Sequence, residues 1–337
     1  MESRLELEYD ERGRTNRVRR AVGLLLLGLL GLTLLWWTLG RATAADRRLS
    51  VHRGVATAVP AADSAARPAI RVLAWNVAHG RGDAEPGLLR NFRGGSEEER
   101  TARLARIAAV LRRADADVVV LNEVDFDASW SGGVNQADVL ARAAGYGTRV
   151  EQRNYDVRLP FAAFSFGNAV LARPPVLAAR WVDLPPHSRI EALAAGAKSA
   201  SVVRLDTRLG PLTVVPVHLE VRSGETRRAA LPALEAVRRE EDAPLVLAGD
   251  FNASPPGWPG AERSTVVGEL LDGGWTSPRA RAGPGPGELT YPMPSPERAI
   301  DWILVEPPLR VVEARVVEAD TGLSDHAPVL AVIRRAG

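Results

Sequence analysis

Short apolar runs that end in polar residues recur along the chain from residue 70 onward. The first, IRVLAWNV at 70–77, is typical of a buried strand. Further strand-like runs follow it, at 118–121, 169–172, 200–205, 212–217, 245–249, 300–305, 311–317 and 328–333. Between them, apolar residues at helical spacing predict helices over 97–114 and 136–144. A third helix is expected over 225–240, where Pro232 can kink or delay it.

This order of elements predicts an α/β (α+β) domain in which strands predominate and some neighbours are antiparallel. Residues 81–96 are rich in Gly and charge, and residues 276–298 are crowded with Gly and Pro, so both are expected to be surface loops. The sequence contains no internal repeat strong enough to suggest a repeat architecture. We therefore expect one compact domain over residues 70–335.

The N-terminal part of the chain has a different pattern. Residues 21–40 carry no charge and are mostly Leu, Gly and Ala. Twenty helical residues span about 30 Å, the thickness of a bilayer's hydrocarbon core. Trp36 and Trp37 lie near one end, where aromatic rings favour the membrane interface. The pattern predicts a transmembrane anchor over 21–40.

Arginines before the anchor favour a cytoplasmic segment at 1–20 and a domain outside the cytoplasm, although further arginines follow the anchor and weaken this preference. Residues 41–69, rich in Ala, Arg and Pro, are expected to be a linker. The alternative is a cleaved signal peptide, because Ala42-Thr43-Ala44 offers a small-residue cleavage pattern. In that case the protein would be secreted.

Composition excludes several classes of chemistry. The formal net charge is only +2 over 337 residues, which gives no reason to expect nucleic acid as the partner. Cysteine is absent, so the chain has no disulfide, thiolate metal site or Cys nucleophile. Lys198 is the only lysine among 43 basic residues. No obligate protein partner is inferred.

The segment LVLAGDFN at 245–252 is the most informative for chemistry. Asp250 and Asn252 are two positions apart at the end of an apolar run, so an extended chain presents both on one face. The carboxyl ends of strands in an α/β sheet are where active sites are usually assembled. Carboxylate and amide oxygens suit hard divalent cations such as Mg²⁺.

The same arrangement recurs at other strand ends. Single cases have the simpler explanation of turn capping, but that explanation accounts poorly for the whole set. The set comprises four carboxylates, two histidines and two amides: Glu123, Asp250, Asp301, Asp325, His218, His326, Asn76 and Asn252.

In order and spacing these motifs resemble the endonuclease/exonuclease/phosphatase superfamily, which includes deoxyribonucleases, abasic-site endonucleases, neutral sphingomyelinases and inositol polyphosphate 5-phosphatases. The matching segments are WNV at 75–77, LNEVD at 121–125, GNAVLAR at 167–173, VHLE at 217–220, GDFN at 249–252, TYP at 290–292, AIDWILV at 299–305 and LSDHAPV at 323–329. The resemblance covers essentially the whole domain. It implies a four-layer sandwich of two packed mixed sheets flanked by helices.

The resemblance also implies a cation site and a hydrolytic mechanism. Glu123 would be the central metal ligand, assisted by Asn76 and Asp325, with Mg²⁺ as the ion and Mn²⁺ or Ca²⁺ as alternatives. Asp250 would orient or deprotonate the attacking water, and Asn252 would hold the phosphate or the metal.

The two histidines would contact the phosphoryl group. His326 would donate hydrogen bonds to the phosphoryl oxygens, with Asp301 holding its tautomer. His218 would bind the phosphate from the other side and protonate the leaving oxygen. The residue before Glu123 is Asn122, where many relatives carry Gln, and this change is expected to retune the surroundings of the metal.

Two further residues are candidate members of the site. Asn168 would contact the phosphate, but an Asn that opens a strand looks the same in sequence. His79 in NVAHG would be a further site residue or a structural one.

The expected function is a membrane-tethered, metal-dependent phosphoester hydrolase of the phosphodiesterase or nuclease type. The substrate is a nucleic acid, for which Arg149, Arg153 and Arg158 in an expected loop would supply a basic groove, or a phospholipid head group. The second alternative lacks an evident amphipathic helix or exposed apolar hairpin in the sequence. A non-catalytic binding module that kept the fold is the alternative from another class.

Overall fold

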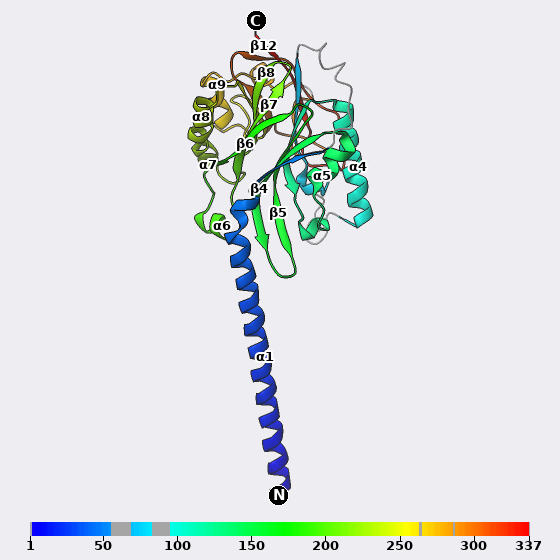
Figure 1. Ribbon diagram of the computed structural model, residues 1–337, viewed down its shortest axis with the longest axis vertical. Coiled ribbons are helices and arrows are strands. Elements are labelled where there is room, and N and C mark those ends of the chain that lie inside the picture. The colour runs from blue at the N-terminus through cyan, green and yellow to red at the C-terminus, as the bar shows by residue number, and fades with distance from the viewer. Residues whose placement is uncertain (1, 55–68, 83–94, 263–264, 286, 337) are drawn as a thin grey trace.

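Two mixed β-sheets pack face to face with helices on their outer sides in the computed structural model, which describes residues 2–54, 69–82, 95–262, 265–285 and 287–336 (Figure 1). The seven-stranded sheet has the order β1-β4-β5-β3-β2-β12-β11, and the five-stranded sheet has the order β10-β9-β8-β7-β6. Each sheet contains one parallel pair, β2 with β3 and β8 with β9, among antiparallel neighbours. The predicted four-layer sandwich is confirmed.

The strands of the seven-stranded sheet are β1 (Leu49–Arg53), β2 (Ile70–Asn76), β3 (Val118–Asp125), β4 (Thr148–Arg158), β5 (Ala163–Ala172), β11 (Leu309–Val316) and β12 (Val329–Arg335). Those of the five-stranded sheet are β6 (Val176–Asp183), β7 (Ser199–Thr207), β8 (Gly210–His218), β9 (Leu245–Asp250) and β10 (Asp301–Val305). Every strand predicted after residue 69 overlaps one of these, whereas β4 and β6 were not predicted.

The helices are α1 (Glu2–Ala42), α2 (Ala44–Arg47), α4 (Glu97–Ala114), α5 (Gln136–Ala144), α6 (Arg189–Ala194), α7 (Gly224–Ala229), α8 (Leu231–Glu240), α9 (Val266–Asp272) and α10 (Pro278–Ala282), with short 3-10 turns η2 (Ala78–Gly80) and η3 (Ser129–Ser131). Helices α4 and α5 have the predicted bounds. The helix expected over 225–240 is divided into α7 and α8, because Pro232 lies in the first turn of α8, where a missing N–H leaves no hydrogen bond unmade. Helix α10 lies in the segment expected to be a loop.

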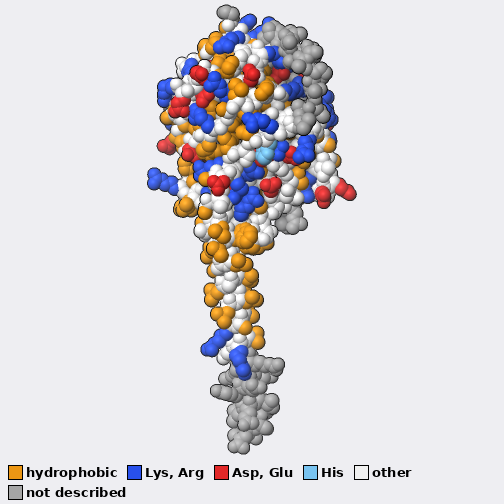
Figure 2. All heavy atoms as spheres, in the orientation of Figure 1, with side chains coloured by type: hydrophobic (Ala, Val, Ile, Leu, Met, Phe, Trp, Pro, Cys, Tyr) orange, Lys and Arg blue, Asp and Glu red, His pale blue; other side chains and the backbone are white. Residues whose placement is uncertain are grey.

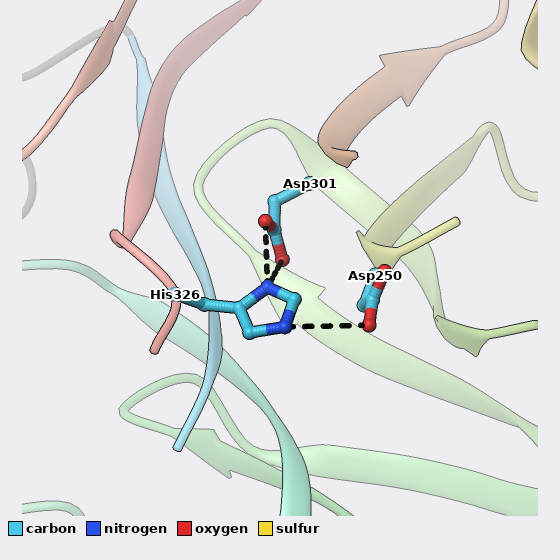
Figure 3. A group of neighbouring side chains, drawn as sticks. All are labelled: Asp250, Asp301 and His326. Carbon is cyan, nitrogen blue, oxygen red and sulfur yellow. Dashed lines mark hydrogen bonds and ion pairs between the residues drawn. The ribbon is translucent and has the colours of Figure 1, made fainter. Parts of the chain in front are cut away.

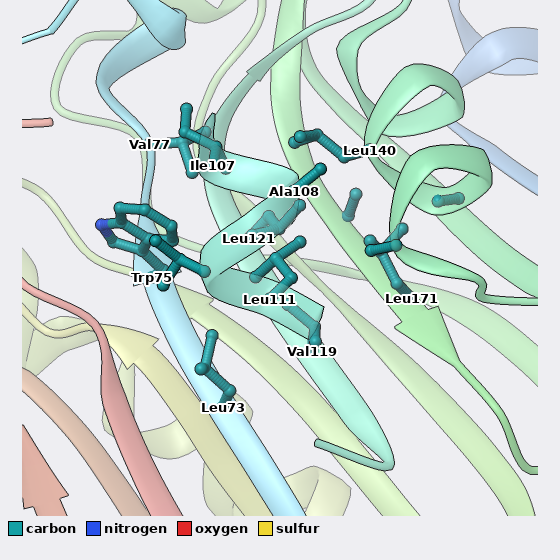
Figure 4. Packing of buried hydrophobic residues seen from close by; sticks show 14 of the residues in the cluster. Leu73, Trp75, Val77, Ile107, Ala108, Leu111, Val119, Leu121, Leu140 and Leu171 are labelled. Carbon is teal, nitrogen blue, oxygen red and sulfur yellow. The ribbon is translucent and has the colours of Figure 1, made fainter. Parts of the chain in front are cut away.

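Alternation along the central strand β2 explains why its two faces pack on different layers. Leu73 and Trp75 point to the outer layer and pack with Ile107 and Leu111 of α4 (Figure 4). Val72 and Ala74 point the other way and pack between the two sheets. Successive strand side chains face opposite sides, so a continuous apolar run can fill both layers of core.

Helix α4 begins where its sequence provides a capping box. The Ser96 side chain accepts a hydrogen bond from the Glu99 backbone N–H, and the Glu99 carboxylate accepts from the Ser96 N–H. These bonds satisfy two of the backbone donors that a helix start leaves free. The cap fixes the start of the helix that covers β2 and β3.

Helix α1 extends from the domain as one continuous helix (Figure 1). Residues Asn16–Ala42 are long and apolar enough to cross a membrane, and none of the most apolar window is buried against the rest of the protein. A signal sequence near the N-terminus would have the same properties.

The predicted linker over 41–69 is wrong in its first part. Residues Leu49–Arg53 form the edge strand β1, paired antiparallel with β4, and α2 precedes it. Apolar and polar residues alternate only weakly in LSVHR. The segment therefore becomes a strand because it pairs with β4, about a hundred residues away in the sequence. Residues 55–68 of the expected linker and 83–94 of the expected loop at 81–96 lie outside the described residues.

The prediction that three arginines form a basic groove in a loop is also wrong. Arg149, Arg153 and Arg158 lie in strand β4, each paired with a carboxylate two residues away. In a strand, residues two apart share a face, so alternating Arg and acidic residues neutralise one another.

Candidate active site

The carboxyl end of β2 and β3 holds one half of the predicted site. Because the two strands are parallel, Asn76 and Glu123 both lie at this end. Strand β12 runs antiparallel to β2, so Asp325 and His326, just before β12, return to the same edge. Residues more than 200 positions apart in the sequence therefore lie together.

The other half lies on the facing sheet. Parallel pairing sets His218 at the end of β8 beside Asp250 at the end of β9. Strand β10 is antiparallel to β9 and begins with Asp301 opposite Asp250. Asn252 follows Asp250, with its backbone N–H donating to the Asp250 carboxylate at 2.8 Å.

A glycine lets β9 approach β8 closely just before the site. Gly249 has a φ of 138°, and a Cβ there would lie 2.0 Å from the Val217 carbonyl oxygen. The same Cβ would lie 2.8 Å from Oδ1 of Asn122, which accepts the Asp250 backbone N–H. The motif GDFN thus needs its glycine to bring Asp250 against the opposite sheet.

His326 lies between two carboxylates (Figure 3). Its Nδ1 is 2.9 Å from Oδ2 of Asp301, and its Nε2 faces Oδ2 of Asp250 at 3.9 Å. Burial alone would lower the pKa of His326, but the two carboxylates outweigh it and raise the pKa to about 10. The imidazole is therefore protonated at neutral pH, with Nδ1–H held by Asp301 and Nε2–H directed into the site.

Asp250 is shared by both sheets. Oδ2 of Asp250 accepts from Nδ2 of Asn76 at 3.2 Å and from Nδ2 of Asn252 at 3.2 Å. Burial is the main cause that raises the pKa of Asp250 to about 6, and the Asp301 carboxylate adds to the rise against the opposing charge of His326. A carboxylate with a raised pKa is a better proton acceptor than an ordinary Asp.

Glu123 projects into the site from an irregular strand. The β3–β5 register shifts between Asn122 and Val124, and Glu123 has a φ of 53°. A bulge redirects a side chain, and positive φ at a non-glycine residue is strained. Burial would raise the pKa of Glu123, but the imidazoles of His79 and His218 lower it to about 2.

The two predicted phosphate-contacting histidines differ in charge. Nε2 of His218 lies 3.7 Å from Oε1 of Glu123 and 3.7 Å from Oδ2 of Asp250. Burial and the nearby ammonium of Lys198 lower the pKa of His218 well below its usual value. His218 is therefore neutral where His326 is charged, so the site offers one charged donor and one neutral imidazole.

Two different sets of residues could hold a cation. Ligand atoms of Asp250, Asp301 and His326 lie within 4.8 Å of one another, a spacing that suits a metal. However, Nδ1 of His326 is already engaged with the Asp301 carboxylate, and Asp301 is completely buried.

The carboxylates of Glu123 and Asp325 suit the cation better, because their side chains are 29% and 23% exposed. Burial raises the pKa of Asp325, and the nearby charge of Glu123 raises it further, against His326. A divalent cation would relieve this crowding of negative charge, and oxygen ligands are what Mg²⁺ prefers. The amide of Asn76 lies beside them, although its Oδ1 accepts the Ala78 N–H at 3.0 Å.

Two candidate residues from the sequence have clear positions. Asn168 is completely buried, and its Oδ1 accepts from Nδ2 of Asn122 at 2.9 Å. It therefore supports Asn122, whose own Oδ1 holds the Asp250 N–H. His79 belongs to the rim of the site, because its Nε2 lies 3.4 Å from Oε2 of Glu123 and its Nδ1 lies 2.7 Å from Oδ1 of Asp125.

Sequence reasoning missed three side chains that support the site. Nζ of Lys198 donates to the Leu219 carbonyl, close enough to the Asp250 and Glu123 carboxylates for both to oppose the fall in its pKa that burial causes. The sequence signal was present, since Lys198 is the single lysine in an arginine-rich chain. Ser324 Oγ accepts the His326 N–H and donates to the Asn76 carbonyl, and Trp130 Nε1 donates to Asp125. No sequence spacing signals these two.

A profile of the Endonuclease/Exonuclease/phosphatase family matches residues 73–326. Among solved structures, an endonuclease/exonuclease/phosphatase from Beutenbergia cavernae is 25% identical with a TM-score of 0.56, covering 80% of this chain and 72% of that one.

The catalytic domain of human Nocturnin, solved with a bound sulfate anion, is 16% identical with a TM-score of 0.53, covering 86% of this chain and 97% of that one. A humanized TDP2 of D. rerio is 16% identical with a TM-score of 0.54, covering 80% and 100%. At this identity the last two show the fold alone. A search of curated proteins gave no significant match.

Proposed function

Because the chain belongs to the endonuclease/exonuclease/phosphatase family, we propose that it is a divalent-metal-dependent hydrolase of phosphoesters. We further propose that residues 21–40 anchor it in a membrane, with residues 1–20 in the cytoplasm and the catalytic unit at 70–335 outside. The reaction replaces the bond between phosphorus and the leaving oxygen with a bond to a water oxygen.

One observation supports this proposal more than any other. His326 is fixed between Asp301 and Asp250 at the edge where both sheets end, with Glu123 and His218 beside them. Five side chains from five strands or strand approaches meet there, and packing alone does not require any of them. Buried ionisable groups are costly and are retained where they do chemistry.

Each side chain has a role that follows from its position. Asp250, with its raised pKa, accepts a proton from the attacking water. The charged Nε2–H of His326 donates to a phosphoryl oxygen, and Asp301 fixes the tautomer that directs it there. Asn252 holds Asp250 in place through its amide, which also donates to the Leu219 carbonyl.

His218 contributes from the opposite wall of the site. Its neutral imidazole lies between Glu123 and Asp250, so it can bind a phosphoryl oxygen or exchange a proton with the leaving oxygen. Because Ser324 Oγ is engaged with the Asn76 carbonyl and the chain has no Cys, we assign the role of nucleophile to water.

The cation that the family implies would be held by Glu123 and Asp325, with Asn76 alongside. When bound it supplies positive charge next to the phosphoryl oxygens and lowers the pKa of nearby water. Mg²⁺ is the ion that this donor set favours, with Mn²⁺ and Ca²⁺ as alternatives.

Removal of the cation tests the proposal directly. The full chain in detergent should hydrolyse bis-p-nitrophenyl phosphate in Mg²⁺, lose this activity in EDTA and regain it when Mg²⁺ is added in excess. Mg²⁺ should also raise the thermal unfolding temperature, since an ion that binds only the folded state stabilises it. Metal-dependent stabilisation without turnover of any phosphoester would contradict the proposal and favour a non-catalytic binding module.

A further inference from the structure

Helix α1 is fastened to the end of the domain that carries the candidate site. The Arg41 guanidinium donates to the carbonyl oxygens of Ala192, Leu193 and Ala195 at 3.0 to 3.1 Å. Trp37 Nε1 donates to the Ala194 carbonyl at 3.0 Å. These bonds join the last turns of α1 to the end of α6, so the orientation of the domain relative to α1 is set by hydrogen bonds.

Strand register gives the distance along the strands between α1 and the site. Arg41 also donates to the carbonyl of Asp156 in β4, and Asp156 pairs with Ser165 of β5. Val124, next to Glu123, pairs with Gly167 of the same strand. Along β5, the position level with the Arg41 contact and the position level with Glu123 are therefore two or three residues apart, roughly 7–10 Å at the usual rise of a strand.

Large apolar side chains are exposed at this same end. Outside α1, the four most exposed large hydrophobic residues that the structure describes are Phe161, Ile190, Leu193 and Val221, which are 78%, 81%, 75% and 63% exposed. We call these four residues the apolar collar. They lie on the β4–β5 turn, on α6 and just after β8. The sequence did not reveal this apolar hairpin tip, because a single Phe follows a Leu-Pro in an otherwise mixed segment.

Members of the apolar collar lie next to the end of α1 and next to the site. The Leu193 carbonyl is one of those held by Arg41, and the β4–β5 turn begins at Arg158, against which Gly40 of α1 packs so closely that a Cβ there would lie 2.9 Å from the Arg158 Cβ. Val221 stands two residues after Leu219, whose carbonyl accepts from Asn252. Figure 2 shows hydrophobic side chains along the part of α1 next to the domain and continuing onto the base of the domain.

We infer that the apolar collar lies in the interfacial layer of the bilayer that α1 spans, so that the site works on phosphoesters carried by lipid head groups. This inference rests on the proposed function of the same site. Isolated exposed hydrophobics are common on proteins, but four gathered beside a membrane-spanning helix mark a membrane surface. Trp36 and Trp37 belong to the same layer, where aromatic rings are favoured.

The charges along β4 do not favour a nucleic acid. Arg153 and Arg158, toward the site end of the strand, are paired with Glu151 and Asp156 at 3.1 and 2.9 Å, and Arg149, at the far end, is paired with Glu151 at 2.8 Å. Nucleic acid binding depends on basic groups that are free to neutralise phosphates along a groove. A lipid head group needs only its own phosphate bound, while the collar holds the surrounding membrane.

Site-specific probes test the location of the apolar collar independently of catalysis. The chain has no cysteine, so Phe161→Cys and Leu193→Cys each provide a single labelling site. Leu177→Cys is the matched control, since Leu177 is 51% exposed at the opposite end of β6, where Val176 pairs with Leu205. The full-length variants would be placed in phosphatidylcholine/phosphatidylserine vesicles with an environment-sensitive fluorophore.

The fluorescence emission of labels at positions 161 and 193 should shift to shorter wavelength and be quenched by brominated lipids. The emission of the label at position 177 should be that of a fluorophore in water. Equal water exposure at all three positions would overturn the inference. Because this measurement needs no turnover, it separates a failure of the inference from a failure of the proposed hydrolase activity.

Substrate choice supplies the second test. The full chain in vesicles that contain phosphatidylinositol phosphates and sphingomyelin should release product from these lipids, and should cleave a DNA oligonucleotide much more slowly. In Phe161→Glu/Leu193→Glu, the ratio of lipid hydrolysis to bis-p-nitrophenyl phosphate hydrolysis should fall roughly tenfold, equal to about 1.4 kcal/mol. Leu177→Glu should keep the ratio. Rapid DNA cleavage with intact lipids, or an unchanged ratio in the collar variant, would contradict the inference.

Discussion

Two corners of the site are built from the same parts. In one, Nδ1 of His326 lies 2.9 Å from Asp301 and Nε2 faces Asp250 at 3.9 Å. In the other, Nδ1 of His79 lies 2.7 Å from Asp125 and Nε2 faces Glu123 at 3.4 Å. In both corners the Asp behind the imidazole is completely buried.

The surroundings of the two imidazoles differ. His326 lies where the two sheets meet, with the ring of Tyr291 at 4.7 Å and its backbone N–H held by Ser324. His79 lies on a left-handed backbone, with a φ of 55°, and packs against Trp130 and Phe166. We propose that the first corner directs a proton donor at the reacting group and that the carboxylate in the second corner is a metal ligand.

The comparison therefore predicts different consequences for similar substitutions. Changes in the His326 corner should reduce turnover even with the cation saturating. Changes in the His79 corner should mainly raise the cation concentration that the enzyme needs, because that corner touches Glu123.

The largest effect is expected from His326→Ala. It removes a charged donor to the phosphoryl oxygens, a loss of about 10³-fold in kcat or more. Hydrolysis of bis-p-nitrophenyl phosphate in saturating Mg²⁺ measures it, and a cooperative thermal unfolding transition shows that the domain is folded. Asp250→Ala should lose a similar amount, while His187→Ala, at an exposed histidine, should lose nothing. A His326→Ala variant within tenfold of the native rate would remove this corner from the mechanism.

A smaller loss is expected from Asp301→Asn, which keeps the size of the side chain but not its charge. Asp301 acts through His326, so its effect is to weaken the preference for the Nδ1–H tautomer and to lower the pKa of His326. We expect kcat to fall about 10²-fold at neutral pH. Nitrogen NMR of the imidazole should show the tautomer change, and an unchanged spectrum together with unchanged turnover would show that Asp301 is only structural.

The cation requirement distinguishes the second corner. His79→Asn keeps a residue that tolerates the left-handed backbone while it removes the imidazole beside Glu123. The Mg²⁺ concentration for half-maximal activity should rise about 10- to 100-fold, the usual effect of removing a group that holds a metal ligand. At saturating Mg²⁺, most of the turnover should return. A loss that Mg²⁺ does not rescue would make the two corners equivalent.

Sequence alone predicted the first corner more completely than the second. Asp250, Asp301 and His326 each follow or precede a strongly apolar strand, and the ends of paired strands meet at one edge whatever the loops do. The role of His79 depends on Asp125 and on an aromatic cluster gathered from β4, β5 and η3. These contacts have no periodic sequence signal.

The missed strands have a similar physical cause. Strand β4, TRVEQRNYDVR, contains more charged and polar residues than apolar ones, because its Arg and acidic side chains pair with each other rather than with a core. Strand β1 is short and forms only by pairing with β4. Hydrophobic patterning predicts the strands that pack in the core, and it misses strands that are held by pairing and charge.

The smallest effect is expected from Trp130→Phe, which tests whether a buried hydrogen bond stabilises the His79 corner. The indole Nε1–H donates to Oδ2 of Asp125 at 2.7 Å, and Asp125 in turn holds His79. Phe keeps the ring contacts but leaves a buried carboxylate without one donor, which should cost about 1–2 kcal/mol of unfolding free energy. Denaturant unfolding measures this loss, and the Mg²⁺ requirement should rise only a few-fold.

Trp181→Phe is the matched control for this prediction. Trp181 Nε1 donates to Oδ1 of Asp183 at the same 2.7 Å, but the Asp183 side chain is 81% exposed, whereas that of Asp125 is 0% exposed. Water replaces the lost donor at Asp183, so the control should change stability by less than about 0.5 kcal/mol. Equal losses in both variants would mean that the indole rings contribute by packing alone. The aromatic cluster, and not the buried hydrogen bond, would then position the residues of the His79 corner.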